Sequence, residues 1–188
     1  SSGKMGFSIA EEARKRGAKV ILISGPTSQK INHQNIEIHK VTSAKEMYEE
    51  VFKYYENCDI AVMSAAVADY TPKFVAKEKI KKSEAEFTIE LIKNPDILKT
   101  MGEKKAHQFL VGFALETQNE EENAKGKLEK KNLDMIVLNS LKDEGAGFQK
   151  DTNKIKILTK TEQKEFHLKS KEEVAKDILD FVEEKLRK

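Results

Sequence analysis

The sequence lacks long apolar runs and an excess of charge, has a single cysteine, and each shortage argues against a class of protein. Cys58 is the only cysteine among 188 residues, so no internal disulfide can form, which fits a reducing cytosol. It begins an apolar run, a position more typical of a buried thiol than of a nucleophile. No apolar run approaches the roughly 18–20 residues that a membrane span needs, and the first residues lack a signal-peptide pattern. We therefore expect a cytoplasmic protein with no membrane segment.

Charge and histidine content narrow the partners further. Lysine and arginine total 34 and aspartate and glutamate total 32, a net charge of +2. Because this balance is so even, composition predicts neither nucleic acid nor a membrane surface as a partner, and any anion site must be local. The four histidines show no ligand spacing such as HExxH, so a metal site built only from side chains is not expected.

Strand and helix patterns alternate along the chain. Apolar runs that predict buried strands occupy residues 19–24, 36–41, 60–67, 109–115 and 133–138. Amphipathic runs that predict helices occupy residues 4–16, 43–55, 95–105, 120–131 and a final segment capped by Ser170. Further strands are expected at 87–93, 154–159 and 165–168. The alternation predicts an α/β fold, a doubly wound and mostly parallel Rossmann-like sheet with a small C-terminal β-hairpin, in one domain over residues 1–188.

The order of the elements is unusual at the start. A doubly wound sheet normally opens with a strand that becomes central, whereas this chain opens at a helix. We therefore expect that the domain is N-terminally incomplete and that upstream residues supply a middle strand, since the sheet would otherwise expose two edges.

Two motifs lie where a ligand could meet the backbone. Gly3 belongs to the segment SSGKMG, which enters a helix whose N–H groups and dipole could hold a phosphate, although an ordinary helix cap explains it equally well. It is not a P-loop, because Met5 follows Lys4. Asp69 ends the segment AAVAD, which completes and follows a predicted parallel strand. Ligands of open α/β sheets bind at this end of a strand, so Asp69 could bind one. The alternative is a carboxylate that caps the next turn.

Lysines and one helix start supply further candidates. Asn94, Pro95 and Asp96 begin a helix, with Pro95 as its first residue and Asn94 as its cap, and capping alone could explain them. Residues 71–86 predict a mobile, lysine-rich flap, because crowded lysines repel each other and suit a polyanion; a solvated charge run is the simpler alternative. Lys127 and Lys131 share a helix face, and Phe113 could stack on a base or fill the core.

The order of the motifs is more specific than any one of them. Together they are similar to the phosphopantothenoylcysteine synthetase family, in its bacterial, CTP-using branch. The matching segments are SSGKMG at 1–6, SGP at 24–26, AAVADY at 65–70, KIKK at 79–82, KNPDIL at 93–98, VGFALET at 111–117 and KN-D-IVLN at 131–139.

The resemblance implies a ligase that activates 4′-phosphopantothenate with CTP to an acyl-cytidylate and then couples it to cysteine. It implies Mg²⁺ with the nucleotide, no flavin in this chain, a homodimer, and possible fusion to a flavin-dependent decarboxylase of coenzyme A synthesis. Lys79 would neutralise the departing pyrophosphate. Together with Gly3, the nucleotide site would comprise Met63, Ser64, Ala65, Asp69, Lys79, Asn94, Pro95, Asp96, Ile97, Phe113, Lys127 and Lys131. The family also uses an asparagine upstream of Ser1.

Two other functions fit the same fold class. A nicotinamide-dependent reductase often carries Tyr-x-x-x-Lys, and none of the four tyrosines has lysine at that spacing. A non-catalytic nucleotide-binding module would have little use for a lysine-rich flap. Pyrophosphate release that depends on CTP, with cysteine-dependent turnover, separates the three.

Overall fold

The computed structural model describes residues 2–76, 78–79, 88–116, 119–140 and 151–187. Its helices are α1 (Lys4–Lys15), α2 (Ala44–Tyr54), α3 (Ile97–Lys104), α4 (Glu120–Lys130) and α5 (Lys171–Leu186), with a 3₁₀ turn at Tyr55–Asn57. The longer strands are β1 (Val20–Ser24), β2 (Ile36–Lys40), β3 (Ile60–Met63), β6 (Phe109–Glu116), β7 (Met135–Ser140) and β9 (Ile155–Leu158). The shorter ones are β4 (Tyr70–Pro72), β5 (Leu91–Lys93), β8 (Thr152–Asn153), β10 (Gln163–Glu165) and β11 (Lys169–Ser170).

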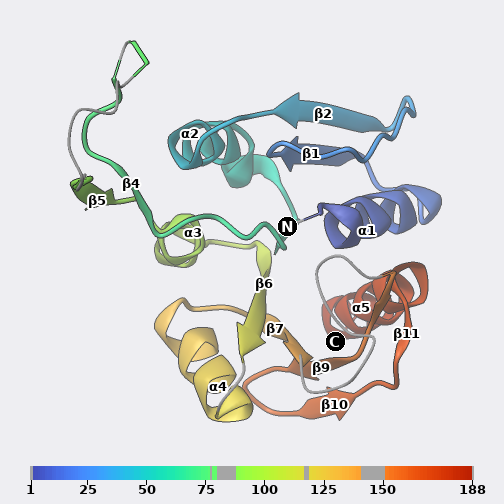
Figure 1. The fold of residues 1–188 in the computed structure, drawn as a ribbon. Helices are drawn as coiled ribbons and strands as arrows, with labels where there is room; N and C mark the ends of the chain where they lie inside the picture. Colours follow the sequence, from blue (N-terminus) through green and yellow to red (C-terminus); the bar gives the residue numbers. More distant parts are fainter. Residues whose placement is uncertain (1, 77, 80–87, 117–118, 141–150, 188) are drawn as a thin grey trace.

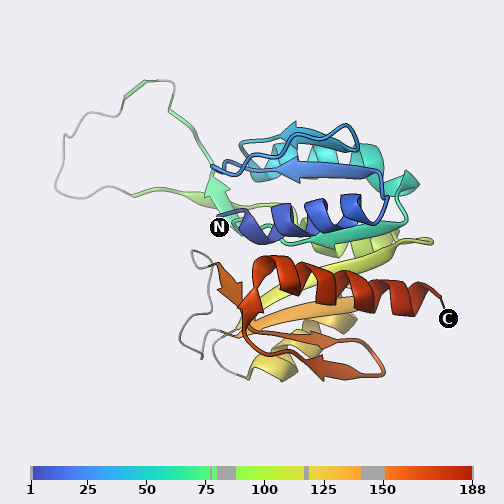
Figure 2. The same cartoon turned by 90° about the vertical axis from the view of Figure 1, so that its right-hand side faces the viewer.

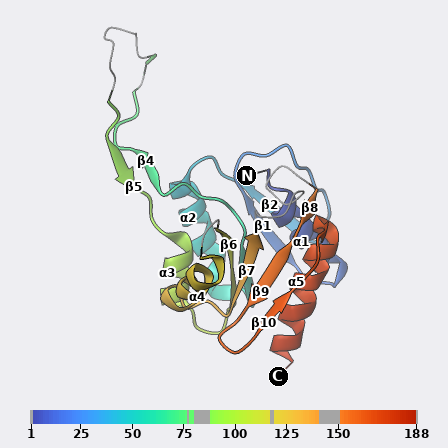
Figure 3. The same cartoon turned by 60° about the horizontal axis from the view of Figure 1, so that its bottom comes forward.

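A five-stranded sheet in the order β10-β9-β7-β6-β3 forms the centre of the molecule (Figures 1 and 3). Strands β3, β6 and β7 are parallel, and β9 and β10 continue the sheet as an antiparallel hairpin. Strands β1 and β2 form a separate parallel pair. The doubly wound, mostly parallel α/β fold with a C-terminal hairpin is thus confirmed.

Helices cover both faces of the central sheet because its strands are apolar on both faces. Along β7, Met135 and Val137 join the cluster under α1 and α5, while Ile136 and Leu138 join the cluster under α2, α3 and α4. All four are at most 2% exposed. Strand alternation with a period of two therefore builds two cores on one sheet.

Strands β1 and β3 each have one unpaired edge in the described part of the chain. Strand β1 pairs with β2 and β3 pairs with β6. Every residue of β1 is half-buried, and Ile60 at the start of β3 is 38% exposed. Strands of a parallel sheet are normally buried by neighbours on both sides, and β1 and β3 are less buried because each has a neighbour on one side only among the described strands.

Four predicted boundaries were wrong. The second hairpin strand, expected at 165–168, runs over Gln163–Glu165. The strand expected at 60–67 ends at Met63, and residues 64–68 are irregular. The helix expected from Pro95 begins at Ile97, and Asp96 rather than Asn94 is its N-cap, accepting the Lys99 N–H at 3.0 Å. The strand expected at 87–93 is confined, among its described residues, to Leu91–Lys93, which pairs with β4.

Strands β4 and β5 form the base of an arm that projects from the body of the molecule (Figures 1 and 2). Thr71 and Pro72, expected in the flap, belong to β4. Most of the predicted flap, residues 77 and 80–86, lies outside the described residues.

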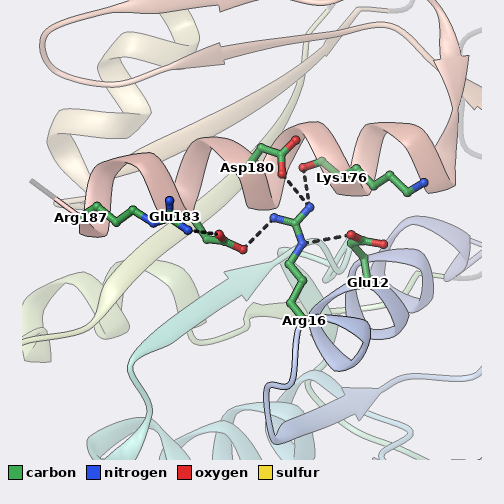
Figure 4. A network of polar contacts seen from close by, with 6 residues as sticks. All are labelled: Glu12, Arg16, Lys176, Asp180, Glu183 and Arg187. Carbon is green, nitrogen blue, oxygen red and sulfur yellow. Dashed lines mark hydrogen bonds and ion pairs between the residues drawn. The ribbon is translucent and has the colours of Figure 1, made fainter.

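Helices α1 and α5 run side by side and are joined by Arg16 at the end of α1 (Figures 2 and 4). Its guanidinium contacts the carboxylates of Glu12 at 3.0 Å, Asp180 at 2.8 Å and Glu183 at 2.8 Å. These contacts raise the pKa of Arg16, although its partial burial opposes the rise. Since all five donors of a guanidinium lie in one plane, a single side chain can bind carboxylates from both helices.

Candidate functional site

The first turn of α1 lies against several segments at the carboxyl end of the sheet. Gly3 has a φ of 78°, a left-handed conformation that favours glycine, and a Cβ there would lie 2.8 Å from Thr27 Oγ1. A Cβ on Gly6 would lie 2.9 Å from Ser64 Oγ, just after β3. The two glycines therefore let the positive end of α1 approach the SGP loop and the end of β3, where a phosphate could bind.

The SGP loop is held against the start of the chain. Thr27 Oγ1 donates to the carbonyl of Ser2 at 2.7 Å. Beside this loop, a cavity of about 530 Å³ opens at the carboxyl ends of β1 and β2, with Phe7 of α1 in its wall.

Two predicted segments are joined by Asn94. Its backbone N–H donates to the carbonyl of Asp69 at 2.8 Å, and its side chain donates to the carbonyl of Ala68 at 2.8 Å. The predicted role of Asn94 as a helix cap was wrong; it connects the segment after β3 to the segment before α3. Asp69, in contact with Asn94, and Ala65, which follows β3, are both exposed, so a ligand can reach both.

Asp96 and Lys131 form an ion pair of 2.9 Å between α3 and the end of α4. Burial alone would raise the pKa of Asp96, but the Lys131 ammonium and the Lys99 N–H lower it. Ile97, the next residue, is 3% exposed, so only its backbone could contact a ligand. Pro95 is exposed just before the cap.

Lys127 lies in a second part of the site, in an open groove of about 560 Å³ between the end of β6 and α4. Its ammonium lies 2.5 Å from Glu116 Oε1. Both predicted lysines of α4 are thus paired with carboxylates, Lys127 with Glu116 and Lys131 with Asp96. A nucleotide phosphate would have to exchange with those carboxylates to bind them.

Three predicted residues make no hydrogen bond or ion pair with this group in the described part of the chain. Phe113 is half-buried and packs against the core under α1 and α5, on the sheet face opposite Lys127. Met63 packs against the other core. Lys79 is exposed and makes no hydrogen bond or ion pair within the described part of the chain.

Sequence reasoning missed a polar cluster beside the first turn of α1. Asn139 and Asn153 are buried with unpaired side-chain oxygens, and Lys171 is buried at the start of α5. Asn139 ends the apolar run LDMIVLN, which could have marked it. Lys171 follows the cap Ser170 and gave no signal beyond a helix start.

None of the described helices is long and apolar enough to cross a membrane. Nor do the described residues contain a group of three or more histidine, cysteine, aspartate or glutamate side chains that could hold a metal ion.

Comparison with known proteins adds the family. The model of the DNA/pantothenate metabolism flavoprotein C-terminal domain matches residues 1–186. The chain belongs to this family. The chain is similar to a solved C-terminal domain of the coenzyme A biosynthesis bifunctional protein CoaBC, with a TM-score of 0.84 and 44% sequence identity. The match covers 100% of this chain and 84% of that one.

Two curated members of the family are closely similar. CoaBC of Bacillus subtilis (strain 168) is 49% identical over 183 residues, 97% of this chain and 45% of that protein. A protein of an unknown prokaryotic organism, named cysteine/cysteine sulfinic acid decarboxylase, is 49% identical over 181 residues, 95% of this chain and 50% of that protein. The chain spans about half the length of the curated relatives it matches.

Proposed function

We propose that this chain is a phosphopantothenate–cysteine ligase that uses CTP. The carboxylate of 4′-phosphopantothenate attacks the α-phosphorus of CTP and pyrophosphate leaves. The amine of cysteine then attacks the acyl carbon, CMP leaves with the electron pair of the broken C–O bond, and the amine proton passes to solvent. The product is 4′-phosphopantothenoylcysteine, an intermediate of coenzyme A synthesis.

One observation carries the proposal: the motifs that resemble the family come together at the carboxyl end of the parallel strands. Asn94 joins the segment ending at Asp69 to the start of α3, and Lys131 joins α3 to α4. Ligands of open α/β sheets bind at this end. The 49% identity to CoaBC over 97% of the chain supports the same substrates.

The roles of the residues follow from charge. Lys127 and Lys131 would exchange Glu116 and Asp96 for nucleotide phosphates, which carry more negative charge. Lys79 would neutralise the leaving pyrophosphate, an electrostatic contribution that rises as the charge develops. Mg²⁺ would neutralise the nucleotide phosphates and be held largely by them, since it keeps few protein ligands. The exposed Asp69 would help to orient the metal–phosphate complex.

The oligomer and the longer protein are part of the proposal. We infer a homodimer that forms through the β4–β5 arm. Its exposed large apolar side chains, unusual for a free surface, are Tyr70, Phe74, Val75, Ile89, Leu91 and Ile92. The terminal hairpin is the weaker candidate, because the exposed residues of β10 are polar. We also propose a fused flavin-dependent decarboxylase and a cytoplasmic location, and the likeness to the bifunctional protein CoaBC supports the fusion. No flavin is assigned to this chain.

The test is pyrophosphate release by the full-length protein with CTP and 4′-phosphopantothenate, followed by cysteine-dependent release of CMP. Lys79→Gln should lower the first rate by about 10²–10³, while Lys45→Gln, an exposed lysine of α2, serves as the matched control. Equal kcat/KM for ATP and CTP would remove the CTP assignment. Release of CO₂ from cysteine without pyrophosphate would favour the decarboxylase activity named for one relative.

A further inference from the structure

The cavity beside the SGP loop is lined by no residue of the nucleotide set that the family resemblance implies. Its walls come from α1, from the ends of β1 and β2, and from the loop that joins these two strands. Its volume of about 530 Å³ lies within the range of small-molecule sites, roughly 300–1,000 Å³. Open α/β sheets bind ligands at the carboxyl ends of their strands, where this cavity opens. The cavity is therefore a candidate for a second small-molecule site.

Five of the residues that line the cavity are apolar: Phe7, Pro26, Ile31, Ile38 and Val41. Val41 is buried, whereas Phe7, Ile31 and Ile38 are only half-buried and Pro26 is exposed. A ligand that covers these side chains removes apolar surface from water, which favours binding. The cavity therefore suits a ligand with an apolar group.

The charged residues of the lining are both lysines. Lys30 and Lys40 are exposed, and neither makes a hydrogen bond or an ion pair within the described part of the chain. Among the described residues, no aspartate or glutamate lines the cavity. In a chain with 34 basic and 32 acidic residues, two cations in one lining without a carboxylate are a local excess of positive charge that suits an anion.

The carboxylates that lie near the cavity in the sequence have other partners. Glu37 in β2 lies 2.8 Å from His39 Nε2, and Glu46 in α2 accepts the Thr42 N–H at 2.7 Å. An external anion can therefore bind Lys30 and Lys40 without displacing an internal partner. The lysines of α4 differ in this respect, because both already contact carboxylates.

The pair of lysines also indicates the kind of anion. A phosphate monoester carries about −1.5 to −2 charge at pH 7 and three strong acceptor oxygens, whereas a carboxylate carries a single charge. Each lysine ammonium has three donors and binds phosphate as a point charge. The side-chain amides of Gln29 and Asn32 line the same cavity and offer further donors. A phosphate monoester therefore matches both cations, and a carboxylate matches only one.

We propose that this cavity binds a phosphate monoester that carries an apolar group, at a site separate from the nucleotide site. The phosphate contacts Lys30 and Lys40, and the apolar group lies against Phe7 and Ile31. The inference stands apart from the proposed ligase activity, because none of these four residues belongs to the set implied for CTP.

The charge contacts are tested with 1-naphthyl phosphate, whose fluorescence reports its binding to the full-length protein. The double variant Lys30→Met, Lys40→Met should raise its Kd at least about 10-fold, as for a lost hydrogen bond to a charged group. The double variant Lys15→Met, Lys19→Met is the matched control, since it removes two exposed lysines just before β1. The control should bind the probe as the unaltered protein does. Equal losses in the two double variants would mean that only net charge matters, and the site would be refuted.

The place of binding is tested with Lys127→Met and with CTP. The Lys127→Met variant should bind 1-naphthyl phosphate as the unaltered protein does, and saturating CTP should not displace the probe. If Lys127→Met or CTP abolishes binding, the probe occupies the nucleotide site and the inference is wrong. Absence of binding to the unaltered protein at millimolar probe would also overturn it. Since none of these measurements needs turnover, the inference and the proposed function fail independently.

The apolar contact is tested with Ile31→Ser, comparing 1-naphthyl phosphate with methyl phosphate, which has little apolar surface. The variant should raise the Kd of the naphthyl ester about 5-fold, because part of the buried apolar surface is lost. The Kd of methyl phosphate, measured by displacement of the naphthyl ester, should stay unchanged. Ile89→Ser, at an exposed isoleucine outside the cavity, is the control. Equal losses for both esters would contradict the contact between Ile31 and the apolar group.

Discussion

Replacing Gly102 by alanine should destabilise the domain, because the backbone of another segment occupies the space of the new methyl group. A Cβ on Gly102 would lie 1.8 Å from the carbonyl oxygen of Lys131. Side chains essentially never approach closer than 3.0 Å, so α3 and the end of α4 must separate by at least 1.2 Å, the difference between those distances. The obstacle is a main-chain oxygen, which cannot rotate away.

The contact is also held in place by its neighbours. Asn132, whose φ is 49°, donates from its side chain to the carbonyl of Gly102 at 3.0 Å. Lys105 Nζ donates to the carbonyl of Asn132 at 2.7 Å. Overpacking typically costs about 1–3 kcal/mol, and the broken hydrogen bonds add about 1 kcal/mol each. Alanine's better helix propensity returns about 1 kcal/mol, so we expect a net loss of about 2–4 kcal/mol.

Gly126→Ala is the matched control, since Gly126 also lies inside a helix but nothing lies within 4 Å of a Cβ there. It should stabilise the domain by about 0.5–1 kcal/mol. Hydrogen exchange of peptides from β6 and β7 in the full-length protein measures this domain alone. Equal protection in the two variants would refute the reasoning. The same shift should displace Lys131 from Asp96 and weaken nucleotide binding.

Three further outcomes follow from single contacts. Arg16→Met should cost about 1–2 kcal/mol at low salt and less at high salt, since Glu12 and Asp180 lose their ion pair with Arg16 and Glu183 is left with the exposed Arg187. Arg187→Met, whose side chain is 80% exposed and contacts Glu183 alone of these carboxylates, should change stability by less than about 0.5 kcal/mol. Equal losses in the two variants would contradict the role of Arg16. Tyr55→Phe should cost about 1–3 kcal/mol in denaturant unfolding, because the buried carbonyl of Met101 in α3 loses its 2.9 Å hydrogen bond. Tyr48→Phe is the control. A difference below about 0.5 kcal/mol between the two variants would count against this role of Tyr55. Burial lowers the pKa of Lys171 from its ordinary 10.5, so the unfolded chain holds that proton more tightly than the folded one. The free energy of unfolding of the unaltered protein should therefore rise with pH toward 10.5, and its difference from that of Lys171→Met should narrow. A constant difference from pH 7 upward would oppose the claim.

The local features of the fold could be predicted from the sequence because they depend on neighbours along the chain. The apolar run LDMIVL predicts a strand buried on both faces, and Met135 to Leu138 are at most 2% exposed. Ser170 was expected to cap the last helix, and its side chain accepts the Glu173 N–H within a complete capping box. The order of the motifs was enough to predict the family.

Tertiary structure alone decided which side chains meet across the chain. Asn94 carries every mark of a helix cap, yet it bonds to Ala68 and Asp69 while Asp96 caps α3, because the β4–β5 pairing places it beside them. Lys171 reads as an ordinary helix start, yet it is buried, and the charge of Lys4 in α1 acts on it. Propensity acts over a few residues, whereas these contacts join residues from 26 apart, as for Asn94 and Ala68, to 147 apart, as for Lys4 and Asp151. The sequence therefore determined the elements, and packing determined the site.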